Sequence, residues 1–158
     1  MIDEIDLQIL ELLQDNSRIS NAEVARCVGL TPPTALERIR KLEKKGIVKG
    51  FHAHLDADQL GCSMLAFVFL RTTESLDGLT TSSAIAKLPE VQELHHVAGE
   101  DCYLAKVRVA NPKALGRLLR EKFGQIAEVI STRSTVVLET IKEDPRLPMY
   151  AAKGECDA

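Results

Sequence analysis

Apolar positions in the first 46 residues predict three helices. The first helix is indicated by an apolar stripe with spacings of three and four residues, formed by Ile5, Ile9, Leu12 and Leu13. Asp3 stands where a cap is needed, and Asn16-Ser17 ends the pattern. A short second helix follows. Its start is marked by the capping box Ser20–Glu23 and its end by Gly29.

The third helix lies in GLTPPTALERIRKLEKKG, from Gly29 to Gly46. One side of it is apolar, with Ala35, Leu36, Ile39 and Leu42. The opposite arc is mostly cationic, and it carries Thr34, Glu37, Lys41 and Lys44, with Arg38 and Arg40 on its flanks. The sequence allows two start points for this helix. Either Thr31 is the cap and Pro32 the first helical residue, or Thr34 and Glu37 form a capping box.

A short helix, a glycine-containing turn and a basic helix together predict a helix-turn-helix, whose second helix enters the DNA major groove. Residues 38–49 hold six basic side chains against the single Glu43, a net charge of plus 5, although the whole chain carries minus 3. We predict that four residues approach base edges: Thr34, Glu37, Arg38 and Lys41. Four others are predicted to hold phosphates: Arg40, Lys44, Lys45 and Lys49. Thr31 is the ninth predicted DNA-binding residue. The alternative is a solvated basic helix.

After Gly46 the sequence IVKGFHAHL predicts a strand that forms a wing or a linker, and the segment from Asp56 marks a domain boundary. His52 and His54 alternate on this strand, a geometry that suits a metal ion, but no third ligand lies at a useful spacing. We therefore predict no metal site and no cofactor.

The second half predicts the order strand, helix, strand, strand, helix, strand. These elements lie at residues 63–72, 78–88, 91–97, 102–109, 112–124 and 129–141. Their order indicates an α+β, ferredoxin-like βαββαβ domain. The predicted organisation is a DNA-binding domain at 1–50, a strand or linker at 51–62, the ferredoxin-like domain at 63–142 and a loosely held tail at 143–158.

The first strand of this domain, SMLAFVFLRT, is apolar on both faces, whereas the helices of the fold cover only one. The uncovered residues are either Leu65, Phe67 and Phe69 or Ala66, Val68 and Leu70. A second subunit is the simplest cover, so the pattern predicts a homodimer through the sheets.

The composition narrows the class of protein. No apolar run is long enough for a membrane span, and the acidic start MIDEID differs from a signal peptide, so we expect a cytoplasmic protein that makes no membrane contact. The 4 cysteines are widely spaced, which favours reduced thiols over disulfides or zinc ligands. An enzyme using Cys102 with His95 or His96 lacks a recognised nucleophile context.

The turn at Gly99, Glu100, Asp101, Cys102 and Tyr103 connects two predicted strands. Its backbone groups and two acids could hold the ammonium and carboxylate groups of a free amino acid, but the spacing alone favours an ordinary hairpin turn with two solvated acids. Thr132 and Ser134 share one face of the last strand, where they could line the same pocket or bond across the sheet.

Both halves of the chain resemble the Lrp/AsnC family of feast/famine transcription regulators. The resemblance rests on DEIDLQILELLQDNSR, LTPPTALERIRKLEKKGIVKGF, VAGEDCYLAKV and TRSTVVLETI, which occur in the family's order. It implies a DNA-binding helix-turn-helix domain and a RAM domain that dimerises and often assembles dimers into octamers. It also implies an amino-acid effector bound between the RAM domains of neighbouring dimers.

Two positions depart from the family pattern. The usual turn is Gly-x-x-Asp-Tyr, but here Cys102 takes the place of the aspartate and an acid, Asp101, lies one residue earlier, which puts the identity of the effector in question. Glu37 stands where many relatives carry a basic residue, which affects sequence preference.

The sequence therefore predicts a non-enzymatic, sequence-specific DNA-binding transcription regulator, whose assembly or DNA affinity an amino acid modulates. Its operator should be roughly palindromic. The alternative is an amino-acid-sensing module that regulates a partner protein by direct contact.

Overall fold

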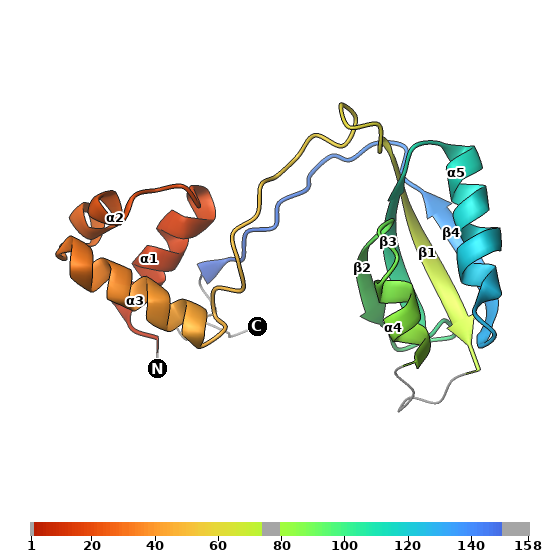
Figure 1. Cartoon of the computed structure of the whole chain (residues 1–158), viewed down its shortest axis with the longest axis horizontal. Coiled ribbons are helices and arrows are strands. Elements are labelled where there is room, and N and C mark those ends of the chain that lie inside the picture. Colours follow the sequence, from red (N-terminus) through yellow and green to blue (C-terminus); the bar gives the residue numbers. More distant parts are fainter. Residues whose placement is uncertain (1, 74–79, 150–158) are drawn as a thin grey trace. The chain divides into compact units, whose positions relative to one another are not determined.

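The computed structural model describes residues 2–73 and 80–149, and the chain forms two compact units (Figure 1). One unit contains the residues up to His54 together with those from Glu143 onward. The other unit spans Leu55–Lys142. None of the helices within the described ranges is long and apolar enough to cross a membrane.

The first unit contains the three predicted helices, which are α1 (Glu4–Asp15), α2 (Asn21–Val28) and α3 (Pro32–Lys44). Asp3 caps α1: its carboxylate accepts a hydrogen bond of 2.8 Å from the backbone N–H of Asp6, and the Asp6 carboxylate accepts one in return from the Asp3 N–H. The hydroxyl of Ser20 caps α2, and Gly29 closes this helix with a left-handed backbone at φ 69°. The capping signals in the sequence were therefore sufficient to place these helices.

The start of α3 is settled by its cap. Thr31 has an extended backbone at the N-cap position, and Pro32 is the first helical residue. Thr34 therefore lies inside the helix, where its hydroxyl is 2.8 Å from the Thr31 hydroxyl. Proline suits this first position because its missing N–H has no partner there in any helix.

The core of this unit is aliphatic and small. Its buried members come from all three helices: Ile9, Leu10, Val24, Ala25, Ala35, Ile39 and Leu42. Full burial of one such Ile, Leu or Val side chain contributes about 1.5–3 kcal/mol. The buried stripe of α3 is the one predicted from its spacing, so the cationic arc faces away from this core.

The second unit is a four-stranded antiparallel sheet in the order β2-β3-β1-β4. Its strands are β1 (Met64–Thr72), β2 (Val91–His96), β3 (Tyr103–Val109) and β4 (Val129–Val136). Helix α4 (Thr80–Ala86) connects β1 to β2, and α5 (Pro112–Arg117) follows β3 (Figure 1). This is the predicted ferredoxin-like arrangement; the expected start of α4, at residue 78, lies outside the described residues.

Beyond α5 the chain continues through a wider π-helical turn and a tighter 3-10 turn to about residue 124, where the helix was predicted to end. The side chain of Asn111 caps the start of α5 by accepting a hydrogen bond of 2.9 Å from the Ala114 N–H. A π-helical turn, Leu118–Lys122, and a 3-10 turn, Phe123–Gln125, then carry the chain toward β4.

The helices pack on one face of the sheet. The core there contains Ala66, Val68 and Leu70 of β1 and Tyr103, Ala105, Val107 and Val109 of β3. The other set of β1 residues, Leu65, Phe67 and Phe69, therefore lies on the opposite face. Of the two alternatives left open by the sequence, this outer face is the one without helices; Phe67 and Phe69 remain partly exposed there, whereas Leu65 is buried.

Two predictions about irregular segments were wrong. Residues 47–62 contain no β-strand in the structure, so this stretch is a linker and not a wing strand. The last strand ends at Val136 and not near Ile141. Both segments were predicted from apolar residues that turn out to be exposed, including Phe51, Leu55, Leu138 and Ile141.

The prediction of a loosely held tail was also wrong for residues 144–149. The side-chain amide of Gln14 donates to the Leu147 carbonyl at 3.1 Å and accepts from the Leu147 N–H at 2.6 Å. The guanidinium of Arg146 lies 3.0 Å from the carboxylate of Asp15. Met149 packs against the helical core. Residues 144–149 are thus part of the first unit, through contacts with the last turn of α1 and with the helical core.

These contacts predict a stability effect of the C-terminal segment on the helical unit. Replacing Arg146 and Met149 together by alanine should lower the free energy of unfolding by about 1–2 kcal/mol, because apolar burial and an exposed ion pair are lost. Thermal unfolding, with hydrogen exchange to locate the change in α1, measures this effect. The matched control is Leu138→Ala with Ile141→Ala, at side chains that are 99% and 85% exposed. Equal melting temperatures for the two variants would contradict the prediction.

Candidate DNA-binding and effector sites

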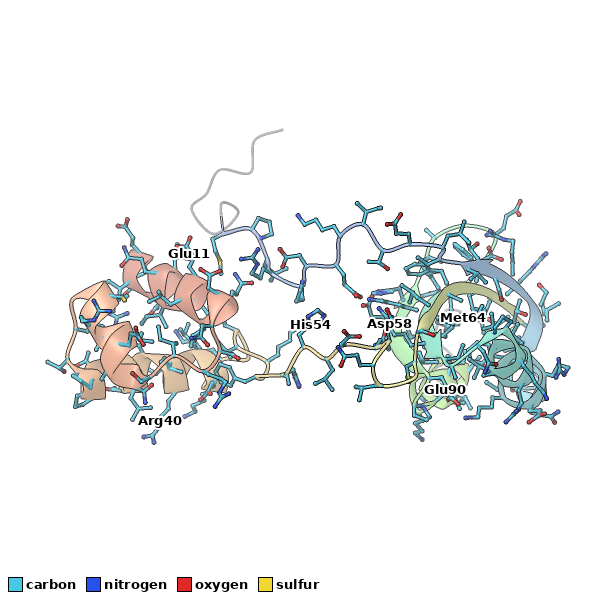
Figure 2. All side chains as sticks on the ribbon, turned by 90° about the horizontal axis from the view of Figure 1, so that it is seen from above. Glu11, Arg40, His54, Asp58, Met64 and Glu90 are labelled. Carbon is cyan, nitrogen blue, oxygen red and sulfur yellow. The ribbon has the colours of Figure 1, made fainter. Side chains whose placement is uncertain are left out.

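The apolar stripe of α3 determines which of its polar side chains reach solvent. Thr34, Glu37, Arg40, Lys41 and Lys44 are exposed. Figure 2 shows Arg40 projecting outward from α3. Thr31, Lys45 and Lys49, at the two ends of this segment, are exposed as well. Eight of the nine predicted DNA-binding residues therefore lie on accessible surface of one unit.

Glu37 and Lys41 form an ion pair one helical turn apart, with Lys41 Nζ 2.7 Å from Glu37 Oε1. The hydrogen bond from Lys41 lowers the pKa of the Glu37 carboxyl. Both side chains are exposed, so the pair contributes little to stability. Glu37 thus presents a carboxylate acceptor beside a cation, which explains how an acid is tolerated on this surface.

Arg40, Lys44, Lys45 and Lys49 make no ion pair within the described residues. Their long side chains are exposed, as is typical of residues that contact phosphates. Lys44 and Lys45 also lie at the C-terminal end of α3, where the helix dipole favours positive charge.

Arg38 is the exception among the predicted DNA-binding residues. Its Nη1 donates to the carboxylates of Asp3 and Asp6, each at 2.7 Å, and its side chain is only 28% exposed. These two hydrogen bonds raise the pKa of Arg38. The pKa of Asp3 is lowered, first by the Asp6 N–H and then by Arg38. The structure therefore places Arg38 between α3 and α1, which differs from the predicted position at a base edge.

The second candidate site is the turn between β2 and β3. The Val97 N–H donates to the Cys102 carbonyl and the Cys102 N–H to the Leu70 carbonyl, both at 2.9 Å. Gly99 sits at φ 150°, a conformation that side chains disfavour, which explains the need for glycine. Glu100 is exposed at the tip of the turn.

Asp101 has a partner that sequence reasoning missed. Its carboxylate lies 2.8 Å from Arg133 Nη2, and the Arg133 guanidinium stacks over the Phe69 ring at 4.1 Å from the ring centre. The alternation of β4 contained the signal, because it places Arg133 on the opposite face from Thr132 and Ser134. Only the register, which pairs Phe69 with Arg133, shows that this face is the one next to Asp101.

The remaining predicted effector residues are separated from that pair. Thr132 and Ser134 pair with Leu70 and Val68, so they lie on the helix-bearing face of the sheet. Tyr103 is buried on that face, with its ring centre 5.1 Å from that of His96. The ring of Tyr103 is therefore part of the core, and its backbone remains next to the turn.

Cys102 and Thr72 lie beside the turn at the edge of the core. The Cys102 thiol is 3.8 Å from the Thr72 carbonyl, which it can reach as a weak donor. The Thr72 hydroxyl is buried and has no hydrogen-bond partner among the described residues. A buried hydroxyl without a partner costs about 1–3 kcal/mol, so a polar group near this position would be stabilised.

The histidines form no metal cluster. His52 and His54 are exposed in the linker, and His95 binds the Glu93 carboxylate at 3.2 Å. Within the described parts of the chain, no group of three or more His, Cys, Asp or Glu side chains is arranged to hold a metal ion.

Two family models match this chain. Residues 2–49 match a winged helix-turn-helix DNA-binding domain, and residues 65–147 match the Lrp/AsnC ligand-binding domain. The leucine-responsive regulatory protein of Klebsiella pneumoniae is 40% identical over 148 residues, which cover 92% of this chain and 90% of that protein. The protein of the same name from Escherichia coli strain K12 is 39% identical over the same length and shares of the two chains.

Solved structures agree over nearly the whole chain. A transcriptional regulator from Neisseria meningitidis in complex with L-methionine has a TM-score of 0.89 at 27% identity, covering 96% of this chain and 99% of that one. A feast or famine regulatory protein from M. tuberculosis, also complexed with L-methionine, has a TM-score of 0.85 at 30% identity, covering 93% and 99%. The chain belongs to the Lrp/AsnC family of DNA-binding transcription regulators, which are not enzymes.

Proposed function

We propose that this regulator binds a roughly palindromic operator as a homodimer and that an amino acid shifts its assembly or DNA affinity. The observation that carries the proposal is the division of α3 into a buried apolar stripe and an exposed arc with free cations. Because its proposed target is DNA, we expect this regulator to act in the cytoplasm.

The exposed arc supports specific roles for its residues. Arg40, Lys44, Lys45 and Lys49 neutralise phosphates, which supplies affinity without reading sequence. Thr34, Glu37 and Lys41 face base edges, where Glu37 can accept a hydrogen bond from a cytosine amine. Thr31 contacts the DNA backbone at the start of the helix.

The DNA proposal is tested by footprinting and by the salt dependence of binding. Protection should cover two half-sites about 10 base pairs, or a multiple of this, apart. Replacing Lys44 by glutamine should reduce the slope of log K against log salt by about 0.9, because one phosphate contact is lost. Lys87→Gln, at an exposed lysine of the other unit, is the matched control. Absence of any protected site would instead favour a sensor that acts through a partner protein.

The homodimer is supported by the outer face of the sheet. Phe67, Phe69 and Leu104 lie on this face and remain partly exposed in the single chain. A second copy would bury these apolar side chains, and apolar burial is the main driving force of stable dimers. Such dimers would then be the units of an octamer, as the family resemblance implies.

A charge on the outer face should disrupt the dimer. Phe67→Asp is expected to raise the dimer dissociation constant by at least a hundredfold, because a carboxylate would be buried between two apolar surfaces. Sedimentation equilibrium measures the constant and also distinguishes dimers from octamers. Ser134→Asp, an exposed site on the opposite face, is the control. Unchanged association of the Phe67 variant would exclude this interface.

The amino-acid effector is supported by the groups around Asp101. Asp101 can hold an ammonium group and Arg133 a carboxylate, while the turn from Gly99 to Tyr103 supplies backbone donors and acceptors. Glu100 and Cys102 line the same turn. Thr132 and Ser134 remain candidates only for a pocket that reaches the other face of the sheet.

Thermal unfolding against the twenty amino acids, one at a time, tests the effector. A ligand at 100 times its dissociation constant should stabilise the folded protein by about 2.7 kcal/mol, because it binds the folded state alone. Asp101→Asn should weaken that stabilisation, since it removes the charge that faces the ammonium group. Asp58→Asn, at an exposed acid of the linker, is the control. If no amino acid raised the melting temperature, the effector would belong to another chemical class.

A further inference from the structure

Arg38 occupies the recognition helix, yet its charge is directed at the protein. One nitrogen, Nη1, donates to Asp3 Oδ2 and to Asp6 Oδ1, each at 2.7 Å. The Asp6 side chain is 11% exposed, compared with 28% for Arg38. Distances of this size are typical of strong, charge-assisted hydrogen bonds, and partial burial protects them from solvent.

The two carboxylates are oriented before Arg38 reaches them. In the capping box of α1, Asp3 accepts from the Asp6 N–H at 2.8 Å, and Asp6 accepts from the Asp3 N–H. Each acid therefore uses one oxygen for the helix start and the other for Arg38. The guanidinium thus ties the first turn of α1 to the middle of α3.

This arrangement withholds one cation from DNA. The three side chains together carry one negative charge, and a phosphate could reach Arg38 only by replacing two carboxylates that are held in place. Arg40, two residues along the same helix, has no carboxylate partner among residues 2–73 and 80–149 and projects outward (Figure 2). The two arginines therefore differ in environment although they lie on flanks of the same basic arc.

We propose that Arg38 is a positioning residue that sets how α3 lies against α1, and that Asp3 and Asp6 raise sequence specificity by keeping its charge from DNA phosphates. Non-specific binding depends almost entirely on phosphate contacts, so one contact fewer weakens it relative to operator binding. The inference rests on the proposed binding of DNA through α3.

Three variants test the inference: Arg38→Met, the double variant Asp3→Asn with Asp6→Asn, and the control Arg40→Met. Asparagine is a good N-cap, so the double variant keeps the capping groups of α1 and removes only their charge. For each protein, affinity is measured against salt concentration on the footprinted operator fragment and on an unrelated fragment of equal length. Circular dichroism and thermal unfolding establish that each variant is folded.

The three variants should differ in their effect on the slope of log K against log salt. Arg40→Met should reduce the slope of log K against log salt by about 0.9. Arg38→Met should leave the slope unchanged but lower operator affinity at least tenfold more than affinity for unrelated DNA. The double variant should steepen the slope by about 0.9 or more and bind unrelated DNA more tightly, because Arg38 is released toward phosphates. Arg38→Lys, which keeps one nitrogen between the two acids, should restore part of the operator affinity.

A reduction of the slope by Arg38→Met equal to that by Arg40→Met would overturn the inference, as would a wild-type slope for the double variant. The double variant retains Arg38, so it decides the question even if Arg38→Met fails to fold. If Arg40→Met left the slope unchanged, α3 would not face DNA, and the proposed DNA surface would fail together with the inference.

Discussion

The packing of one apolar stripe of α3 is the interaction on which the DNA-binding unit depends. Ala35, Ile39 and Leu42 are buried against α1 and α2, so the rotation of α3 about its axis is set by hydrophobic contacts. Every other side chain of the helix then has a determined direction. The core thereby sets which side chains of α3 are exposed.

The sheet of the second unit obeys the same constraint in a different geometry. Alternation along β1 assigns Ala66, Val68 and Leu70 to the helices and leaves Phe67 and Phe69 on the outer face. The Arg133 guanidinium covers part of Phe69 and binds Asp101, so the outer face and the turn between β2 and β3 are joined by one residue. A change at Asp101 therefore acts directly on the surface that we assign to the partner subunit.

Helix caps and the spacing of apolar residues were enough to predict most of the fold, whereas the ion pairs of Arg38 and Arg133 could be found only from the structure. Caps such as Asp3, Ser20 and Asn111 act within three residues, so a linear pattern contains them. The partners of Arg38 are 35 and 32 residues away, and Asp101 and Arg133 are 32 apart. Periodicity states which face a side chain takes, but it does not state what lies opposite. For this reason the sequence did not reveal the two carboxylates that bind Arg38.

Within one subunit, two segments of the chain connect the unit that matches the ligand-binding family model to the helix-turn-helix unit. The division between the units falls after His54 and again after Lys142, so two segments connect them. The second segment ends in Arg146 and Leu147, which bind Asp15 and Gln14 of α1. The first turn of that same helix holds Arg38 of the recognition helix through Asp3 and Asp6. An effector acts only by favouring one of two arrangements. Helix α1 is bonded at its end to Arg146 and Leu147 and at its start to Arg38, so within one subunit it contacts both α3 and a segment that leads from the second unit.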